Sequence, residues 1–156
     1  MAKRTSINAR AKKAEREVQQ YLWPGSRFAG NAKRPALEDQ DLCGVDADGD
    51  LWWGEVKSYN RETIHQCGGP WAVLEAAWHQ CDAAIKRAIE AGTIPANPHV
   101  VPFAVLRVTR TSLESVQNLV MLDALDEAMC ASGTHLCVVP LSEFKAACID
   151  RVEEVA

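Results

Sequence analysis

Three charged residues lie in two short segments that the sequence predicts to be neighbouring strands. Asp41 begins the first segment, whereas Glu55 and Lys57 belong to the second, which is otherwise apolar from Leu51 to Val56. Burying charges in such a strand is costly unless they pair with each other or bind a cation. Hard divalent cations prefer carboxylate oxygens. The pattern therefore predicts a metal site beside a cationic lysine.

The register of the two strands decides whether these residues meet. Asp48 and Gly49 form a turn signal between them. A two-residue loop would turn Asp41 to the opposite face from Glu55, whereas a three-residue loop over 47–49, closed by a left-handed glycine, places Asp41 opposite Glu55. Lys57 shares that face because strand residues alternate. We favour the three-residue loop, and a two-residue turn with a bulge would have the same result.

This set of side chains suits phosphodiester hydrolysis. Asp41 and Glu55 would bind Mg²⁺, for which Mn²⁺ would substitute, and the main-chain carbonyl of Val56 could supply a third oxygen. Such a metal activates a water molecule and polarises a phosphate. Lys57 would orient or deprotonate that water, or neutralise the charge that develops. The alternative is an exposed acidic hairpin with a surface lysine.

A helix is predicted over residues 6–21, with Ser6 as a candidate N-cap and Pro24 after its end. Glu15 lies on the flank of its apolar stripe. Two roles are open for this acid: it could reach the hairpin as a metal ligand or base, or it could pair with Lys12 along the helix.

The order of these features resembles the PD-(D/E)XK nuclease superfamily, and within it the archaeal-type Holliday-junction resolvases and their phage relatives. The resemblance covers roughly residues 8–90, and Gln40 departs from it where the family carries proline. Its motifs are Glu15 with Arg16, then Gly30 and Asn31 with Lys33 and Arg34, then Asp41, and finally Glu55, Val56, Lys57 and Ser58. It implies an α/β fold with a restriction-endonuclease-like core, in which helices flank a central mixed β-sheet.

The same resemblance implies an activity and residue roles. The protein would be a Mg²⁺-dependent endonuclease that cuts branched DNA, most simply as a homodimer on a two-fold junction. Asp41, Glu55 and Glu15 would bind the metal with the Val56 carbonyl, and Lys57 would be the catalytic lysine. The residues expected to contact DNA are Arg4, Arg10, Lys12, Lys13, Arg16, Arg27, Asn31, Lys33, Arg34, Ser58 and Gln80. Another nuclease of the superfamily, or a non-catalytic DNA-binding protein, is the alternative.

Charge is unevenly distributed along the chain. The formal net charge is -4, yet residues 1–34 hold nine Lys or Arg against two acids. A basic segment beside an acidic metal site is suited to following a phosphate backbone. The alternative is a solvated basic tail that aids solubility.

Composition bounds the remaining possibilities. With 156 residues, of which 47% are hydrophobic, the chain is expected to form one domain over 1–156, with 1–13 as a basic flexible arm. No apolar segment approaches the roughly 20 residues of a membrane span, and no secretory signal is apparent. We therefore expect a cytoplasmic protein of a bacterium or of a phage-infected cell. Its six cysteines are expected to be reduced and mostly small core residues. A zinc site at the two His-x-Cys pairs is the lesser alternative, because their spacing matches no standard zinc finger.

The rest of the chain predicts alternating helices and strands. Residues 58–70 form a polar connection after the catalytic strand, and Pro102 favours an edge strand or the start of one. Helices are expected over 71–91, 123–131 and 141–152, and strands over 100–108, 116–122 and 135–139.

Overall fold

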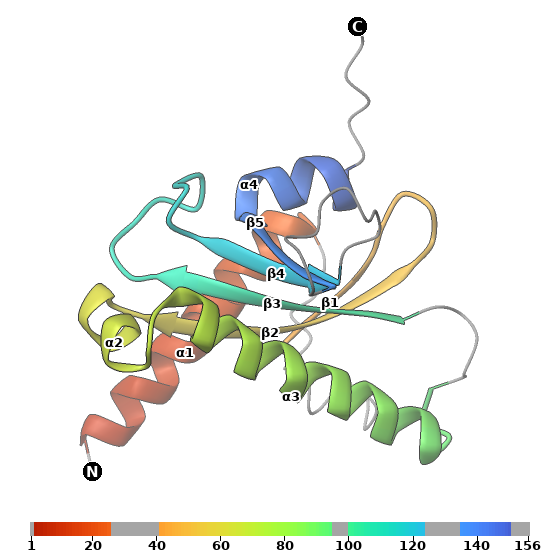
Figure 1. Cartoon of the computed structure of the whole chain (residues 1–156), viewed down its shortest axis with the longest axis horizontal. Coiled ribbons are helices and arrows are strands. Elements are labelled where there is room, and N and C mark those ends of the chain that lie inside the picture. The colour runs from red at the N-terminus through yellow and green to blue at the C-terminus, as the bar shows by residue number, and fades with distance from the viewer. Residues whose placement is uncertain (1, 26–40, 95–99, 124–134, 151–156) are drawn as a thin grey trace, which may run out of the picture.

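A five-stranded mixed sheet forms the centre of the molecule (Figure 1). The computed structural model describes residues 2–25, 41–94, 100–123 and 135–150, and side chains from residue 9 onward. Strands β2 and β3 are parallel, and the other neighbours are antiparallel. The strands, in their order across the sheet, are β1 (Leu42–Val45), β2 (Leu51–Tyr59), β3 (Val100–Val108), β4 (Leu119–Asp123) and β5 (Leu136–Pro140). The predicted α/β class with a mixed sheet is confirmed.

Helices cover both faces of this sheet (Figure 1). One face packs against α1 (Ala2–Leu22) and α4 (Leu141–Phe144), which continues as the π-helical turn η4 (Lys145–Ile149). The other face packs against α2 (Arg61–Gln66) and α3 (Pro70–Glu90). Helix α3 connects β2 to β3, since parallel neighbours require a long crossover. Within the described part of the chain, no helix is both long and apolar enough to cross a membrane.

The core beside β2 is aromatic and tightly packed. The Phe103 ring lies edge-on to Trp52, with centroids 5.9 Å apart, and stacks on Phe144 at 5.1 Å. Gly54 lies over the same ring, and a Cβ added there would come within 2.6 Å of it. Any side chain at this position, directly before Glu55, would clash with the Phe103 ring, which explains the glycine.

The β1–β2 hairpin has the three-residue loop predicted from sequence. Leu42 pairs with Gly54, so the same register places Asp41 opposite Glu55. The amide of Asp46 donates to the Asp50 carbonyl at 3.0 Å, and Gly49 adopts a φ of +89°. The buried Asp46 carboxylate accepts three further hydrogen bonds, from the amides of Asp48 and Asp50 at 2.8 and 3.1 Å and from the Trp52 indole at 2.8 Å. This buried acid thus holds the turn together.

Several boundaries differ from the sequence predictions. Helix α1 begins at Ala2, so Ser6 is not its N-cap and residues 2–13 are the first turns of a helix, not an arm. The reason is composition, because this stretch is rich in strong helix formers such as Ala, Arg and Lys. The expected connection 58–70 contains α2, which begins after Asn60, whose side chain accepts a hydrogen bond from the Thr63 amide at 2.8 Å.

The later elements lie close to where they were predicted. The helix expected over 71–91 is α3, and the strand expected over 100–108 has those bounds. That strand is central and not an edge strand, but Pro102 precedes its ladder with β4, which begins at Phe103. The strand expected over 116–122 starts only at Leu119, because Asn118 is buried and bonds the surrounding turns. The helix expected over 123–131 lies outside the described residues, apart from its first residue.

Replacing Asp46 with alanine should destabilise the fold by about 2–3 kcal/mol, because the Trp52 indole N–H and two turn amides lose a charged acceptor. Urea unfolding measures this change. Asp50→Ala is the matched control, since the Asp50 side chain makes no hydrogen bond with the described residues, and it should cost less than about 0.5 kcal/mol. Equal losses in both variants would show that Asp46 does not hold the turn.

Candidate active site

Asp41 and the part of β2 that carries Glu55 meet at the end of β1 that lies away from the hairpin turn. Asp41 lies just before β1, and its carboxylate accepts a hydrogen bond from the Val56 amide at 2.9 Å. This side chain takes the place that a strand neighbour would occupy beside β2. In a ladder the N–H and C=O of one residue face the same neighbour. The Val56 carbonyl therefore faces the side of β2 on which Asp41 lies.

Glu55 and Lys57 project from β2 on the face covered by α3. Strand alternation puts them with Trp53, which packs on that helix, and opposite Trp52, which packs in the core beneath α1. Glu55 is 4% exposed, whereas Lys57 is half-buried. Strand β2 thus carries a buried carboxylate, Glu55, next to a partly solvated ammonium group, that of Lys57.

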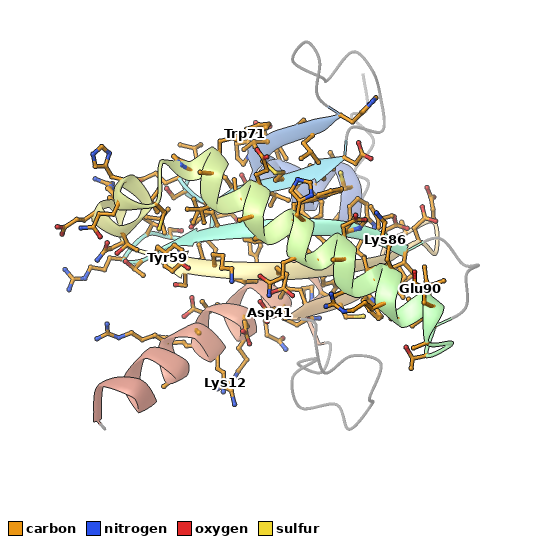
Figure 2. The ribbon with its side chains drawn as sticks, turned by 60° about the horizontal axis from the view of Figure 1, so that its bottom comes forward. Lys12, Asp41, Tyr59, Trp71, Lys86 and Glu90 are labelled. Atoms are coloured by element: carbon orange, nitrogen blue, oxygen red, sulfur yellow. The ribbon has the colours of Figure 1, made fainter. Side chains whose placement is uncertain are left out.

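Helix α1 brings the fourth residue, Glu15, to the same place. In Figure 2, Asp41 lies between α1 and β2, and Lys12 projects from α1 nearby. Glu15 makes a hydrogen bond with Asp41 and is close enough to Lys12 and Lys57 for both charges to act on it. No salt bridge joins Lys12 to Glu15 within the described part of the chain. The helix therefore directs Glu15 to Asp41, and the intrahelical pair is a minor interaction.

Burial and mutual repulsion hold protons on two of these acids. Desolvation, followed by the charge of Asp41 and a hydrogen bond with it, raises the pKa of Glu55 from 4.5 to about 8. The same causes raise the pKa of Glu15 to about 7. Lys57 opposes both shifts, but it does not cancel them. Near neutral pH the cluster thus retains protons that a bound cation would displace.

A cysteine, and not the predicted glutamine, faces this cluster from α3. Cys81 is fully buried, and its thiol donates to the Trp53 carbonyl at 3.1 Å. Burial and then the charge of Glu55 raise the pKa of this thiol to about 12. Gln80 is exposed on α3. The sequence signal for Cys81 is its place on the apolar stripe of α3 with Ala77, Ala84 and Ile85, a position that by itself indicates only packing.

The residues expected to contact DNA are distributed in three ways. Ser58 is half-buried on β2, on the opposite face from Lys57. Arg27, Asn31, Lys33 and Arg34 lie outside the described residues, as does the side chain of Arg4. The exposed ones on α1 are Arg10, Lys12, Lys13 and Arg16.

A second charged cluster serves the fold on the opposite face of the sheet. Arg107 is 11% exposed and bridges to Glu17 at 3.3 Å, while Lys13 lies 3.8 Å from the same acid. Arg107 also donates to Thr111 and Asn118. Glu17 is thus rotated away from the site and ties α1 to β3.

The acids of the described residues are not arranged with the geometry of a complete metal site. Among the described residues, no group of three or more His, Cys, Asp or Glu side chains is arranged to hold a metal ion. The donor chemistry nevertheless suits a hard cation, because Asp41, Glu55, Glu15 and the Val56 carbonyl offer only oxygens. A cation would also offset the desolvation and the repulsion from Asp41 that raise the two pKa values.

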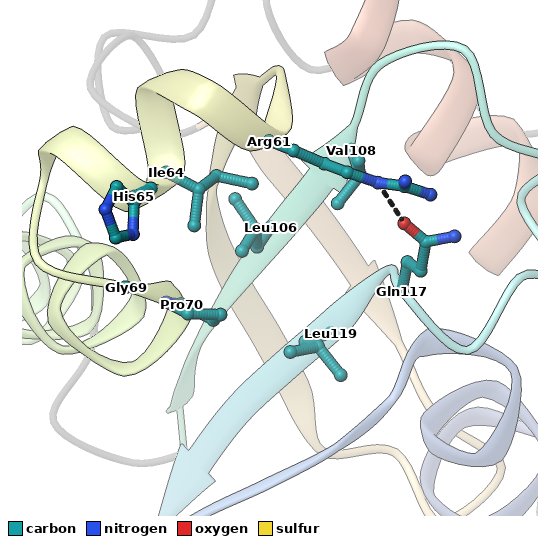
Figure 3. A pocket seen from close by; sticks show the side chains of 9 residues that line it. All are labelled: Arg61, Ile64, His65, Gly69, Pro70, Leu106, Val108, Gln117 and Leu119. Atoms are coloured by element: carbon teal, nitrogen blue, oxygen red, sulfur yellow. Dashed lines mark hydrogen bonds between the residues drawn. The ribbon is translucent and has the colours of Figure 1, made fainter.

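A cavity of about 350 Å³ lies apart from these residues (Figure 3). Its floor is apolar, and Arg61 and Gln117, joined by a hydrogen bond of 2.9 Å, lie at its rim. Glu15, Asp41, Glu55 and Lys57 do not line it. The lining residues are Arg61, Ile64, His65, Gly69, Pro70, Leu106, Val108, Gln117 and Leu119.

The raised pKa values predict how stability depends on pH without metal. Because the folded pKa values of Glu15 and Glu55 exceed the usual 4.5, their contribution is fully present below about pH 4.5 and is lost as pH rises through about 7 and 8. Urea midpoints measured in chelator should fall from about pH 5 to about pH 9, and Glu55→Gln should flatten this decline. Glu90→Gln, an exposed control on α3, should leave it unchanged. An identical decline in Glu55→Gln would refute the shift.

In comparisons with known proteins, no protein-family model, no curated protein and no solved structure matches the chain.

Proposed function

We propose that this protein is a metal-dependent nuclease that hydrolyses phosphodiester bonds in DNA. The observation that carries the proposal is the meeting of Glu15, Asp41 and Glu55 beside Lys57, where the buried Glu55 and the half-buried Glu15 both have raised pKa values. Strongly perturbed carboxylates next to a charged partner are typical of functional sites. Burying them would otherwise only destabilise the fold.

Each residue has a role in the proposed reaction. Asp41 and Glu55, with the Val56 carbonyl and Glu15, would hold Mg²⁺ or Mn²⁺. The bound cation would supply Lewis acidity and a more acidic water. Glu15 and Glu55 would lose their protons on binding it, so affinity should rise about tenfold per pH unit for each proton displaced.

Lys57 would act on the substrate side of the cluster. Its ammonium group shares a face with Glu55 and is only half-buried, so it is open to an incoming phosphate. There it would orient or deprotonate the attacking water and neutralise charge on the phosphate. An alanine at this position would remove those interactions without emptying the carboxylate cluster.

The exposed basic side chains of α1 support DNA as the substrate. Lys12 lies on the side of α1 that carries Glu15, so a DNA backbone that reaches the carboxylates would pass it. Arg10 and Lys13 are exposed elsewhere on this helix, where Lys13 lies beside Glu17. The sheet order, with a hairpin followed by a parallel crossover, is compatible with a restriction-endonuclease-like core. The choice of branched DNA, such as a Holliday junction cut by a homodimer, rests on the motif resemblance alone.

Cleavage of a labelled four-way junction in Mg²⁺ tests the proposal. Asp41→Asn and Lys57→Ala should each lower the rate by at least about a hundredfold, because the first removes a charged ligand of the cation and the second removes the ammonium group beside the reacting phosphate. Lys86→Ala is the matched control, since this exposed lysine pairs with Asp82 on α3, and it should cut normally.

The substrates separate the related possibilities. Paired symmetric nicks in the junction would identify a resolvase, and equal cutting of linear duplex would identify another nuclease. DNA binding without metal-dependent cutting of any substrate would contradict catalysis and favour a DNA-binding protein.

The exposed basic side chains of α1 are tested by binding in chelator. Replacing Arg10, Lys12 and Lys13 with glutamine should weaken junction binding and reduce the slope of log K against log salt by roughly 1 for each phosphate that is no longer neutralised. The same change at Lys86 and Arg87, on the exposed side of α3, should alter neither quantity. Unchanged affinity and slope in the α1 variant would exclude these three side chains as DNA contacts.

A further inference from the structure

Helix α1 lies lengthwise along the outer edge of β1. Gln19 donates through Nε2 to the Cys43 carbonyl at 2.8 Å and accepts through Oε1 from the Cys43 amide at 3.1 Å. One turn later the Trp23 indole donates to the Val45 carbonyl at 3.1 Å. Since β1 is at the edge of the described sheet, these side chains satisfy main-chain groups that a further strand would otherwise pair with.

The spacing of these contacts extends to the carboxylates. Glu15, Gln19 and Trp23 recur every four residues, which advances a helix by about 6 Å. Asp41, Cys43 and Val45 recur every two residues, which advances a strand by about 6.6 Å. The two periods match closely enough for three successive pairs to form. The pair of Glu15 with Asp41 is therefore one position before the pair of Gln19 with Cys43.

Gln19 is unusually placed for an amide side chain. It is fully buried beside Val18, yet both ends of its amide bond the same residue of β1. Trp23 adds steric fit, because its ring lies where a Cβ on Gly44 would be, only 2.0 Å away. The two contacts fix both the rotation of α1 and its position along β1.

We propose that Gln19 is a positioning residue, whose two hydrogen bonds with Cys43 hold α1 in the one register that places Glu15 at Asp41. The inference rests on the proposed function only in so far as these acids bind a metal. Gln19 itself contacts neither substrate nor metal in this scheme. A helix shifted by one residue would rotate Glu15 by about 100° away from Asp41.

The closing experiment compares Gln19→Leu with Gln20→Leu, the same change at the exposed neighbouring position. Amide exchange in chelator is the first measurement, since the Val56 amide donates to Asp41 and the Cys43 amide donates to Gln19. Gln19→Leu should speed exchange about tenfold or more at both amides, because both bonds depend on the helix register. Gln20→Leu should change neither.

Mn²⁺ affinity, measured by calorimetry, is the second measurement. Gln19→Leu should weaken binding by about 10- to 100-fold, as for other residues that orient metal ligands. In a Glu15→Gln background it should have little further effect, because Gln19 acts through Glu15. Faster exchange at Cys43 alone, with Val56 protection and Mn²⁺ affinity unchanged, would overturn the proposal.

The two hypotheses can fail separately. If the wild type binds no Mn²⁺ and cuts no DNA, the proposed function is wrong, yet exchange at Val56 still decides whether Gln19 positions the cluster. If Gln19→Leu fails to fold, Gln19→Glu keeps the size and the acceptor for the Cys43 amide, and it should lose protection at Val56 to a smaller extent.

Discussion

The register of one hairpin is the constraint on which the rest of the site depends. A buried carboxylate, Asp46, accepts hydrogen bonds from the turn and from Trp52, and Gly49 closes the loop in the left-handed conformation. A slip of one residue would send Asp41 to the other face of the sheet. The Val56 amide would then lose its carboxylate acceptor. A local turn thus determines whether a cluster of acids exists at all.

Electrostatics at this cluster works against the stability of the fold. Desolvation outweighs the attraction of Lys57, since the pKa values of Glu15 and Glu55 rise despite that cation. The fold tolerates the cluster because large apolar groups pack elsewhere, in the aromatic cluster of Trp52, Phe103 and Phe144 and beneath α3. Without a ligand the carboxylates of this cluster repel one another, so a bound cation would stabilise them. This is the physical basis of the proposed function.

Edge protection and site assembly are achieved by the same contacts. The outer edge of β1 is covered by α1 through Gln19 and Trp23, and not by another strand. Beside Asp41, one face of β2 carries both Glu55 and Lys57. The polar cluster of Arg107, Glu17 and Asn118 ties the same helix to β3 on the opposite face. Helix α1 is therefore fixed on two sides.

The sequence by itself determined the hairpin register, the long helix after it, the strand 100–108 and the α/β class, because turn chemistry and the periods of 2 and 3.6 are local properties. It also singled out Asp41, Glu55 and Lys57, whose charges are conspicuous in an apolar strand. Local patterns did not decide where α1 begins, that Cys81 and not Gln80 faces the acids, or that Glu15 meets Asp41. Those depend on how α1 and α3 rotate against the sheet, and that rotation is set by contacts between residues distant in sequence, such as Gln19 with Cys43.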